Sequence, residues 1–159
     1  MIPACDIVLR RAQADDAAAI GQLTRAAYAP WAALIGREPL PMGFDHGAMI
    51  RDHLVDGLWR GDALLAVIEM IVRESDLLIE NIAVAPTEQG AGLGGRLLGH
   101  AETTARSLGR HVVRLYTNSL FASNIALYRR HGYHTDREEI VANGIVVHMM
   151  RNLDEGRSP

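Results

Sequence analysis

Residues 77–86 read Leu-Leu-Ile-Glu-Asn-Ile-Ala-Val-Ala-Pro, and residues 87–95 continue as Thr-Glu-Gln-Gly-Ala-Gly-Leu-Gly-Gly. The first segment is rich in Leu, Ile and Val and ends at Pro86, which cannot donate to a sheet, so it predicts a strand over residues 77–84. From residue 93 to residue 108, apolar side chains recur at helical spacing. The stretch therefore predicts a strand, a glycine-rich loop and a helix, in that order.

The glycine-rich loop predicts an anion-binding site. Gly90, Gly92, Gly94 and Gly95 let the backbone approach a ligand, because no Cβ atom stands in the way. The first N–H groups of a helix have no intrahelical partner, and the positive end of the helix dipole lies beside them. We therefore expect a phosphate-bearing cofactor over residues 89–95.

Two common nucleotide-binding motifs fit this loop poorly. A P-loop requires Gly-x-x-x-x-Gly-Lys-Ser/Thr, and the chain contains no lysine, which excludes it. Gly90, Gly92 and Gly95 match the dinucleotide fingerprint Gly-x-Gly-x-x-Gly literally. That fingerprint should follow its strand directly and be answered by an acidic residue about 20 residues later. Here five residues separate Val84 from Gly90, and the next expected strand ends in Thr-Asn, which makes the dinucleotide interpretation weak.

A third interpretation matches the chain in several places. Residues 89–94, Gln-Gly-Ala-Gly-Leu-Gly, fit a Gln/Arg-x-x-Gly-x-Gly/Ala loop. Downstream come Leu-Tyr-Thr-Asn at 115–118, Asn-Ile-Ala-Leu-Tyr at 124–128 and Gly-Tyr at 132–133. In this order and spacing, the motifs resemble those of the GNAT superfamily of acetyl-CoA-dependent N-acetyltransferases. The resemblance covers about residues 64–150.

Length, composition and charge indicate the number of domains and the kinds of partner. The chain has 159 residues, 48% of them hydrophobic, which suffices for one globular domain, so we expect a single N-acetyltransferase domain over 1–159 with 153–159 as a frayed tail. It contains no run of 18 apolar residues and no signal-peptide pattern at its start. A net charge of −3 gives no electrostatic case for nucleic acid. We expect a cytoplasmic protein without membrane or nucleic-acid partners.

Metal and disulfide chemistry are not indicated. Cys5 is the single cysteine, which excludes an internal disulfide framework and a cysteine zinc cluster. His131 and His134 straddle Gly132 at a helix-to-strand junction rather than sharing a helical face, so we expect no metal site. Dimerisation is compatible with the sequence, but no segment marks an interface.

The resemblance implies an α+β, three-layer fold: a mixed, mostly antiparallel sheet with helices on both faces. The strands ending at Val84 and Thr117 are expected to splay apart and form the cofactor cleft. Periodicity predicts the other strands over residues 7–11, 58–60, 63–72, 133–141 and 145–152, the last two as a hairpin around Asn143-Gly144. Helices are expected over residues 15–28, 45–55, 93–108 and 124–130. Three prolines and a glycine predict a loop over 28–42.

Tyr128 is the candidate general acid. Asn124 and Tyr128 stand at positions i and i+4 of a short helix, so their side chains share a face. The resemblance places Tyr128 near the CoA sulfur and Asn124 near the pantetheine arm. The alternatives are a core tyrosine with a satisfied hydroxyl group and a plain helix N-cap at Ser123 or Asn124.

Glu80 is the candidate general base, because an unpaired carboxylate inside an apolar strand is costly and calls for an explanation. Strict alternation groups Glu80 with Leu78 and Ile82, whereas Asn81 and Ala83 face the other way. A bulge, which the resemblance suggests, would alter this grouping. The alternatives are an arginine partner, exposure to solvent, or a water relay that needs no dedicated base.

The resemblance also assigns binding residues. The expected cofactor contacts are Ile82, Ala83, Val84, Gln89, Gly90, Ala91, Gly92, Leu93, Gly94, Gly95, Asn124 and Tyr128, with Arg96 or Arg129 on phosphate. The residues expected to line the acceptor pocket are Trp31, Ile35, Arg37, Glu38 and Met42, although a plain surface loop would explain them equally well.

The implied reaction is the transfer of an acetyl group from acetyl-CoA to a primary amine, by direct attack in a ternary complex without a metal. The acceptor is a small amine, an amino acid or a protein N-terminus. Two other classes remain open: a CoA-binding regulatory module of the same fold without turnover, and a dinucleotide-binding oxidoreductase.

Overall fold

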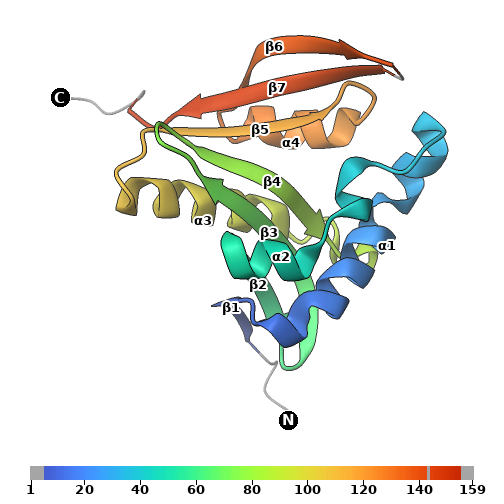
Figure 1. The fold of residues 1–159 in the computed structure, drawn as a ribbon, viewed down its shortest axis with the longest axis vertical. Coiled ribbons are helices and arrows are strands. Elements are labelled where there is room, and N and C mark those ends of the chain that lie inside the picture. Colours follow the sequence, from blue (N-terminus) through green and yellow to red (C-terminus); the bar gives the residue numbers. More distant parts are fainter. Residues whose placement is uncertain (1–5, 143, 155–159) are drawn as a thin grey trace.

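The computed structural model describes residues 6–142 and 144–154 and contains one seven-stranded sheet (Figure 1). Its strands are β1 (Ile7–Arg11), β2 (Leu54–Arg60), β3 (Ala63–Val72), β4 (Leu77–Val84), β5 (Val112–Asn118), β6 (His134–Val141) and β7 (Gly144–Asn152). The spatial order is β1-β2-β3-β4-β5-β7-β6, and every neighbouring pair is antiparallel except β4 and β5. This is the mixed, mostly antiparallel sheet that was predicted.

Helices cover both faces of the sheet (Figure 1). They are α1 (Ala17–Ile35), α2 (His46–Asp52), α3 (Leu93–Ser107) and α4 (Ala122–Arg130). One core packs α3 and α4 against the sheet, and a second core packs α1 and α2 against the opposite face. The apolar stripe predicted for α3 is buried against the first core: Leu93, Leu97, Leu98, Ala101 and Ala105.

The first half of the expected loop is wrong, because α1 continues over residues 28–35. Pro30 lies inside the helix and costs it a backbone hydrogen bond, which is why the sequence predicted an end there. Packing favours the longer helix, since the rings of Trp31 and Phe121 lie 4.6 Å apart between centroids. The helix ends at Gly36, whose φ of +73° is in the left-handed region that favours glycine.

Other boundaries shift by a few residues. The helix expected over 45–55 ends at Asp52, because residues from Leu54 onward pair with β3 instead. α4 begins at Ala122 with Phe121 in the N-cap position, so the alternative of a plain helix N-cap at Ser123 or Asn124 is wrong.

Residue 153, the first of the expected frayed tail, packs into the core instead. Leu153 is 4% exposed, and its N–H group donates to the carbonyl oxygen of His111 at 2.7 Å. Residues 155–159 lie outside the described residues, as do Cys5 and Asn143.

Across the described ranges, no helix has both the length and the apolar character to cross a membrane.

A β-bulge at Glu80 changes which side chains face each core. Ile79 pairs with Met70 and Asn81 pairs with Glu69, so Glu80 is an extra residue on β4. Before the bulge Ile79 faces α3, and after it the even-numbered residues, beginning with Ile82, take that face. The grouping expected from strict alternation is therefore wrong beyond Glu80, and the alternative of a bulge is confirmed.

β4 and β5 separate directly after the bulge. They pair over three positions, with Leu77, Leu78 and Ile79 opposite residues 113–115, and then diverge (Figure 1). The splayed opening expected between these strands is present, and it lies between α1 on one face and α4 on the other.

A buried carboxyl group ties α1, α2 and β4 together beneath this opening. Glu69 of β3 is 0% exposed, and its Oε1 atom lies 2.9 Å from His46 Nδ1. Asn81 Nδ2 donates to the same Oε1 at 2.7 Å and to Thr24 Oγ1 at 3.3 Å. Because buried polar groups are costly unless they are paired, these bonds hold the two helices at the edge of the opening.

Replacing Glu69 by glutamine should lower the free energy of unfolding by about 1–3 kcal/mol. A carboxylate accepts hydrogen bonds at both oxygens, whereas the NH2 group of glutamine is a donor and would lie against neighbouring donors. Glu88→Gln is the matched control: its pair with Arg60 has a similar length of 3.0 Å but is exposed, so the cost should stay below about 1 kcal/mol. Urea denaturation measures both values. Equal and small losses would show that the buried cluster does not hold the helices in place.

Candidate active site

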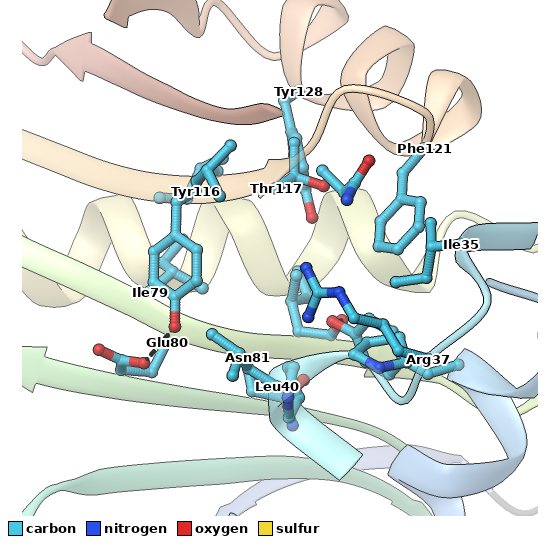
Figure 2. A pocket seen from close by; sticks show the side chains of 17 residues that line it. Ile35, Arg37, Leu40, Ile79, Glu80, Asn81, Tyr116, Thr117, Phe121 and Tyr128 are labelled. Carbon is cyan, nitrogen blue, oxygen red and sulfur yellow. Dashed lines mark hydrogen bonds between the residues drawn. The ribbon is translucent and has the colours of Figure 1, made fainter. Parts of the chain in front are cut away.

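Two cavities meet where β4 and β5 separate. The strand cavity, of about 70 Å³, is bounded by both strands, α4 and the segment that follows α1 (Figure 2). The loop cavity, of about 410 Å³, extends from the same opening to the glycine-rich loop and the start of α3. Tyr28, Ile82 and Tyr128 line both cavities and therefore mark the passage between them.

The loop cavity gathers the residues expected to bind the cofactor. Apart from the arginines expected on phosphate, Ala91 alone of that set is not part of the lining. The residues present are Ile82, Ala83, Val84, Gln89, Gly90, Gly92, Leu93, Gly94, Gly95, Asn124 and Tyr128. β4 and the glycine-rich loop are adjacent in the sequence, and the fold brings the more distant α4 to them at the opening between β4 and β5.

Glycines are needed at the start of α3 for two different reasons. Gly90 and Gly92 have φ values of +85° and +81°, which L-residues with side chains rarely adopt. A Cβ atom on Gly94 would lie 3.1 Å from Leu127 Cδ2, and one on Gly95 would lie 2.8 Å from His131 Nε2. The loop can therefore turn sharply and still let α3 pack closely against α4.

Free backbone donors converge on the loop cavity. The first backbone bond of α3 runs from Arg96 N–H to Gly92 O at 3.0 Å, so the N–H groups of residues 93–95 have no intrahelical acceptor. Together with the helix dipole, they suit an anion such as a phosphate group. Arg130 of α4 also lines the cavity, whereas Arg96 and Arg129, the arginines expected near phosphate, do not.

The open edge of β4 presents its own backbone groups. Ile82 O accepts from the Tyr28 hydroxyl at 3.3 Å, and Val84 O accepts from Gln89 Nε2 at 3.2 Å, so both carbonyls point away from β3. In a strand, the N–H and C=O groups of one residue point the same way. The N–H groups of Ile82 and Val84 therefore also face the opening, where an extended ligand could pair with them.

Glu80 has a partner that the sequence did not reveal. The Tyr116 hydroxyl donates to Glu80 Oε2 at 2.6 Å across the separating strands (Figure 2). Burial and this carboxylate both raise the pKa of Tyr116 above its ordinary value. No described arginine pairs with Glu80, so the expected alternative of an arginine partner is wrong. Tyr116 fixes one carboxylate oxygen, and no hydrogen bond from the described residues occupies the other.

Tyr128 occupies the passage between the cavities. Its side chain is 4% exposed, and its ring packs edge-on against Tyr133 with centroids 6.3 Å apart. Burial raises the pKa of the Tyr128 phenol, and no hydrogen bond from the described residues adds to this shift. A protonated hydroxyl group is thus held at the meeting point of the two cavities, which differs from the alternative of a satisfied core tyrosine.

The residues expected to line the acceptor pocket are divided by the structure. Ile35 and Arg37 line the strand cavity, and Trp31 lines the loop cavity. Glu38 and Met42 line neither, and Glu38 instead lies 3.7 Å from Arg25. The extension of α1 explains this result, because it moves the start of the connecting segment seven residues further along the chain.

Several residues of the strand cavity were not foreseen. Among them are Tyr28, Pro39, Asn81 and Phe121. A polar residue beside Glu80 in an apolar strand was a signal for Asn81, but strict alternation placed it on the other face. Tyr28 and Phe121 carry no local signal, because they reach the cavity through the packing of α1 and of the segment that leads into α4, and Pro39 reaches it on the segment after α1. Among the described residues, no group of three or more His, Cys, Asp or Glu side chains could hold a metal ion.

Known proteins share this architecture. The profile of one family, described as Acetyltransferase (GNAT) domain, matches residues 54–135, slightly more than half of the chain. No curated protein sequence matches the chain significantly. Solved structures match over nearly the whole chain, but at identities that establish likeness of fold alone.

Three of these structures illustrate the likeness. The PaiA N-acetyltransferase of Thermoplasma acidophilum, solved with coenzyme A, has a TM-score of 0.80 at 17% identity, covering 92% of this chain and 99% of that one. The ribosomal-protein-S18-alanine N-acetyltransferase of Escherichia coli has a TM-score of 0.77 at 20% identity, covering 97% and 100%. The yncA protein of Salmonella typhimurium, solved with acetyl-CoA, has a TM-score of 0.71 at 20% identity, covering 97% and 98%.

Proposed function

The chain belongs to the family of GNAT acetyltransferase domains, and on that premise we propose that it transfers an acetyl group from acetyl-CoA to a primary amine. The observation that carries this proposal is the passage at Tyr128, which joins a large cavity at a glycine-rich loop to a small cavity that contains a carboxylate. Two substrates that enter from opposite sides would meet there. Reaction by direct attack needs this arrangement, because both reacting groups must be held together.

The loop cavity fits a CoA-type ligand. The N–H groups of residues 93–95 would receive the pyrophosphate, and those of Ile82 and Val84 would pair with the pantetheine arm. Gly90 and Gly92 keep the approach free of side chains. Proteins of this fold have been crystallised with CoA or acetyl-CoA, which supports the assignment. When bound, acetyl-CoA supplies an activated thioester carbonyl carbon.

Glu80 is proposed to take the proton that the attacking amine loses. An alkylammonium of pKa about 10.4 is neutral in roughly one molecule in 2,500 at pH 7, so deprotonation costs about 4–5 kcal/mol. A carboxylate in the strand cavity can accept this proton, after which the nitrogen lone pair is free to attack the thioester carbon and form the C–N bond. The hydrogen bond from Tyr116 at 2.6 Å holds the carboxylate in one orientation, and no hydrogen bond from the described residues occupies its second oxygen.

Tyr128 is proposed to donate a proton to the sulfur as the C–S bond breaks. Because burial raises the pKa of its phenol, the residue stays protonated across the physiological range and can act as a donor throughout. A phenol of pKa about 10 is a weaker acid than a thiol of about 8.5, so full transfer is uphill by roughly 2 kcal/mol in bulk water. Burial raises the pKa of the Tyr128 phenol and therefore adds to this cost. The positive end of the α3 dipole favours the developing negative charge and offsets part of this cost.

Ligand binding tests the cofactor assignment. Acetyl-CoA or CoA at 100 times its dissociation constant should stabilise the protein by about 2.7 kcal/mol and raise its Tm by roughly 5–10 °C. Gly92→Val should reduce the shift, because φ is +81° there, whereas Gly99→Ala in the same helix should keep it, because its Cβ would meet nothing within 4 Å. A shift with NAD in place of CoA would refute the assignment.

Tyr128→Phe should lower kcat by about 10²-fold or more, with the KM for acetyl-CoA nearly unchanged, because one proton donor is lost and the ring remains. Tyr133→Phe is the matched control: its hydroxyl group is buried without a described partner, so removing it should leave steady-state rates unaltered. A Tyr128→Phe enzyme as active as the parent would assign the proton to another group. Acetyl-CoA binding without turnover in either protein would indicate a regulatory module.

Glu80→Gln should lower kcat/KM most at low pH. The neutral fraction of the amine rises about tenfold per pH unit towards its own pKa, so the need for a base decreases as pH rises. The ratio of wild-type to Glu80→Gln activity should therefore shrink between pH 6.5 and 9.5 in steady-state assays. A ratio that stays constant over this range would favour a water relay instead of Glu80.

A further inference from the structure

The strand cavity contains two buried polar atoms whose hydrogen-bonding capacity is unmet. Arg37 Nε and Asn81 Oδ1 have no partner among the described residues, and both residues line this cavity. The only other such atom in the described ranges, the Tyr133 hydroxyl oxygen, belongs to a residue outside the cavity lining. Leaving a donor and an acceptor buried without partners costs free energy, so a ligand that satisfies both is expected.

Arg37 brings a positive charge into the cavity. It follows the left-handed turn at Gly36, and its guanidinium group extends toward the middle of the cavity (Figure 2). The neighbouring carboxylate of Glu38 lies 3.7 Å from Arg25 and is engaged there instead. A guanidinium group binds a carboxylate or phosphate through two parallel hydrogen bonds, so its natural partner here is an anionic group of the ligand.

Asn81 brings a fixed acceptor. Its side chain is 1% exposed, and Nδ2 donates to Glu69 Oε1 at 2.7 Å and to Thr24 Oγ1 at 3.3 Å. With the amide nitrogen held in this way, Oδ1 is left to accept a hydrogen bond from an N–H group of the ligand. Asn81 follows Glu80 directly at the bulge, where both residues line the same cavity. The amine-binding end of the cavity therefore has a neutral acceptor beside a carboxylate.

The size of the cavity limits the ligand. A volume of about 70 Å³ has room for roughly five or six water-sized groups, which is the scale of an amino-acid backbone. An amine without an anionic group would fill this space and leave the charge of Arg37 unpaired.

We propose that the acetyl acceptor is a small amine that also carries an anionic group, of the amino-acid class, with its amine between Asn81 and Glu80 and its anion on Arg37. This inference rests on the proposed acetyl transfer for its reaction but not for its binding chemistry. The chemistry of transfer is unchanged: the amine nitrogen forms the new C–N bond and gives its proton to Glu80.

The test compares matched acceptors. Each common amino acid is assayed beside its amide, which keeps the amine and side chain but removes the negative charge, and 2-aminoethyl phosphate is included to separate phosphate from carboxylate. The best acid should have a kcat/KM above that of its amide. Arg37→Gln should reduce kcat/KM for the acid by roughly 10- to 100-fold and leave the value for the amide nearly unchanged.

Arg25→Gln is the matched control, because Arg25 lies near the same segment but pairs with Glu38 on the surface. It should leave the preference for the acid intact. Compared with Arg37→Gln, Arg37→Lys should retain part of the preference for the acid, because lysine keeps the positive charge but cannot form the two parallel hydrogen bonds of a guanidinium group. Equal use of acids and amides, or an Arg37→Gln enzyme with unaltered preference, would overturn the inference while the acetyl transfer stands. Fast acetylation of peptide N-termini would overturn it in the same way.

A binding measurement separates this inference from the proposed function. The preferred acid should raise the Tm of the wild-type protein but not that of Arg37→Gln, with no acetyl donor present. Stabilisation of this kind without turnover would contradict the acetyl transfer and support the assignment of the cavity. Turnover without selective stabilisation by the acid, and without preference for the acid over its amide, would support the acetyl transfer and contradict the assignment of the cavity.

Discussion

The extra residue in β4 is the constraint on which the site depends. At Glu80 the strand gains one position relative to β3, and the ladder to β5 ends immediately afterwards. A bulge bends its strand and increases the local twist, so β4 can remain paired on one side while it leaves its neighbour on the other. The same irregularity places Glu80 and Asn81 side by side in one cavity and leaves the backbone of Ile82 and Val84 facing the opening.

Two strands that separate inside a protein must be held apart, and hydrogen bonds from side chains do this between β4 and β5. Tyr28 and Gln89 satisfy the carbonyl groups of Ile82 and Val84, while Tyr116 reaches across the gap to Glu80. Below them, the buried carboxyl group of Glu69 ties His46 and Asn81 into one cluster. Buried polar groups specify an arrangement because each alternative leaves one of them unpaired. The opening is therefore part of the folded structure and does not require a ligand to form it.

The two cavities divide the chemistry between them. The loop cavity offers backbone donors and a helix N-terminus, which suit an elongated phosphate ligand whatever its acyl group. The strand cavity offers side chains, among them Glu80, Arg37 and Asn81, which can distinguish one small molecule from another. A fold of this kind can keep one donor site and serve different acceptors, because a change in the residues after α1 leaves the glycine loop undisturbed.

Local sequence alone determined the central unit of strand 77–84, glycine loop and α3. Apolar periodicity, Pro86 and the glycines predict these elements, and the sequence motifs indicate the family. Interactions between neighbours in sequence are sufficient for these features. Tertiary structure decided the length of α1 beyond Pro30, the partner of Glu80, and the entry of Arg37 rather than Glu38 into the cavity. Each of these depends on contacts between segments far apart in the chain, where packing and the pairing of buried polar groups outweigh local preference.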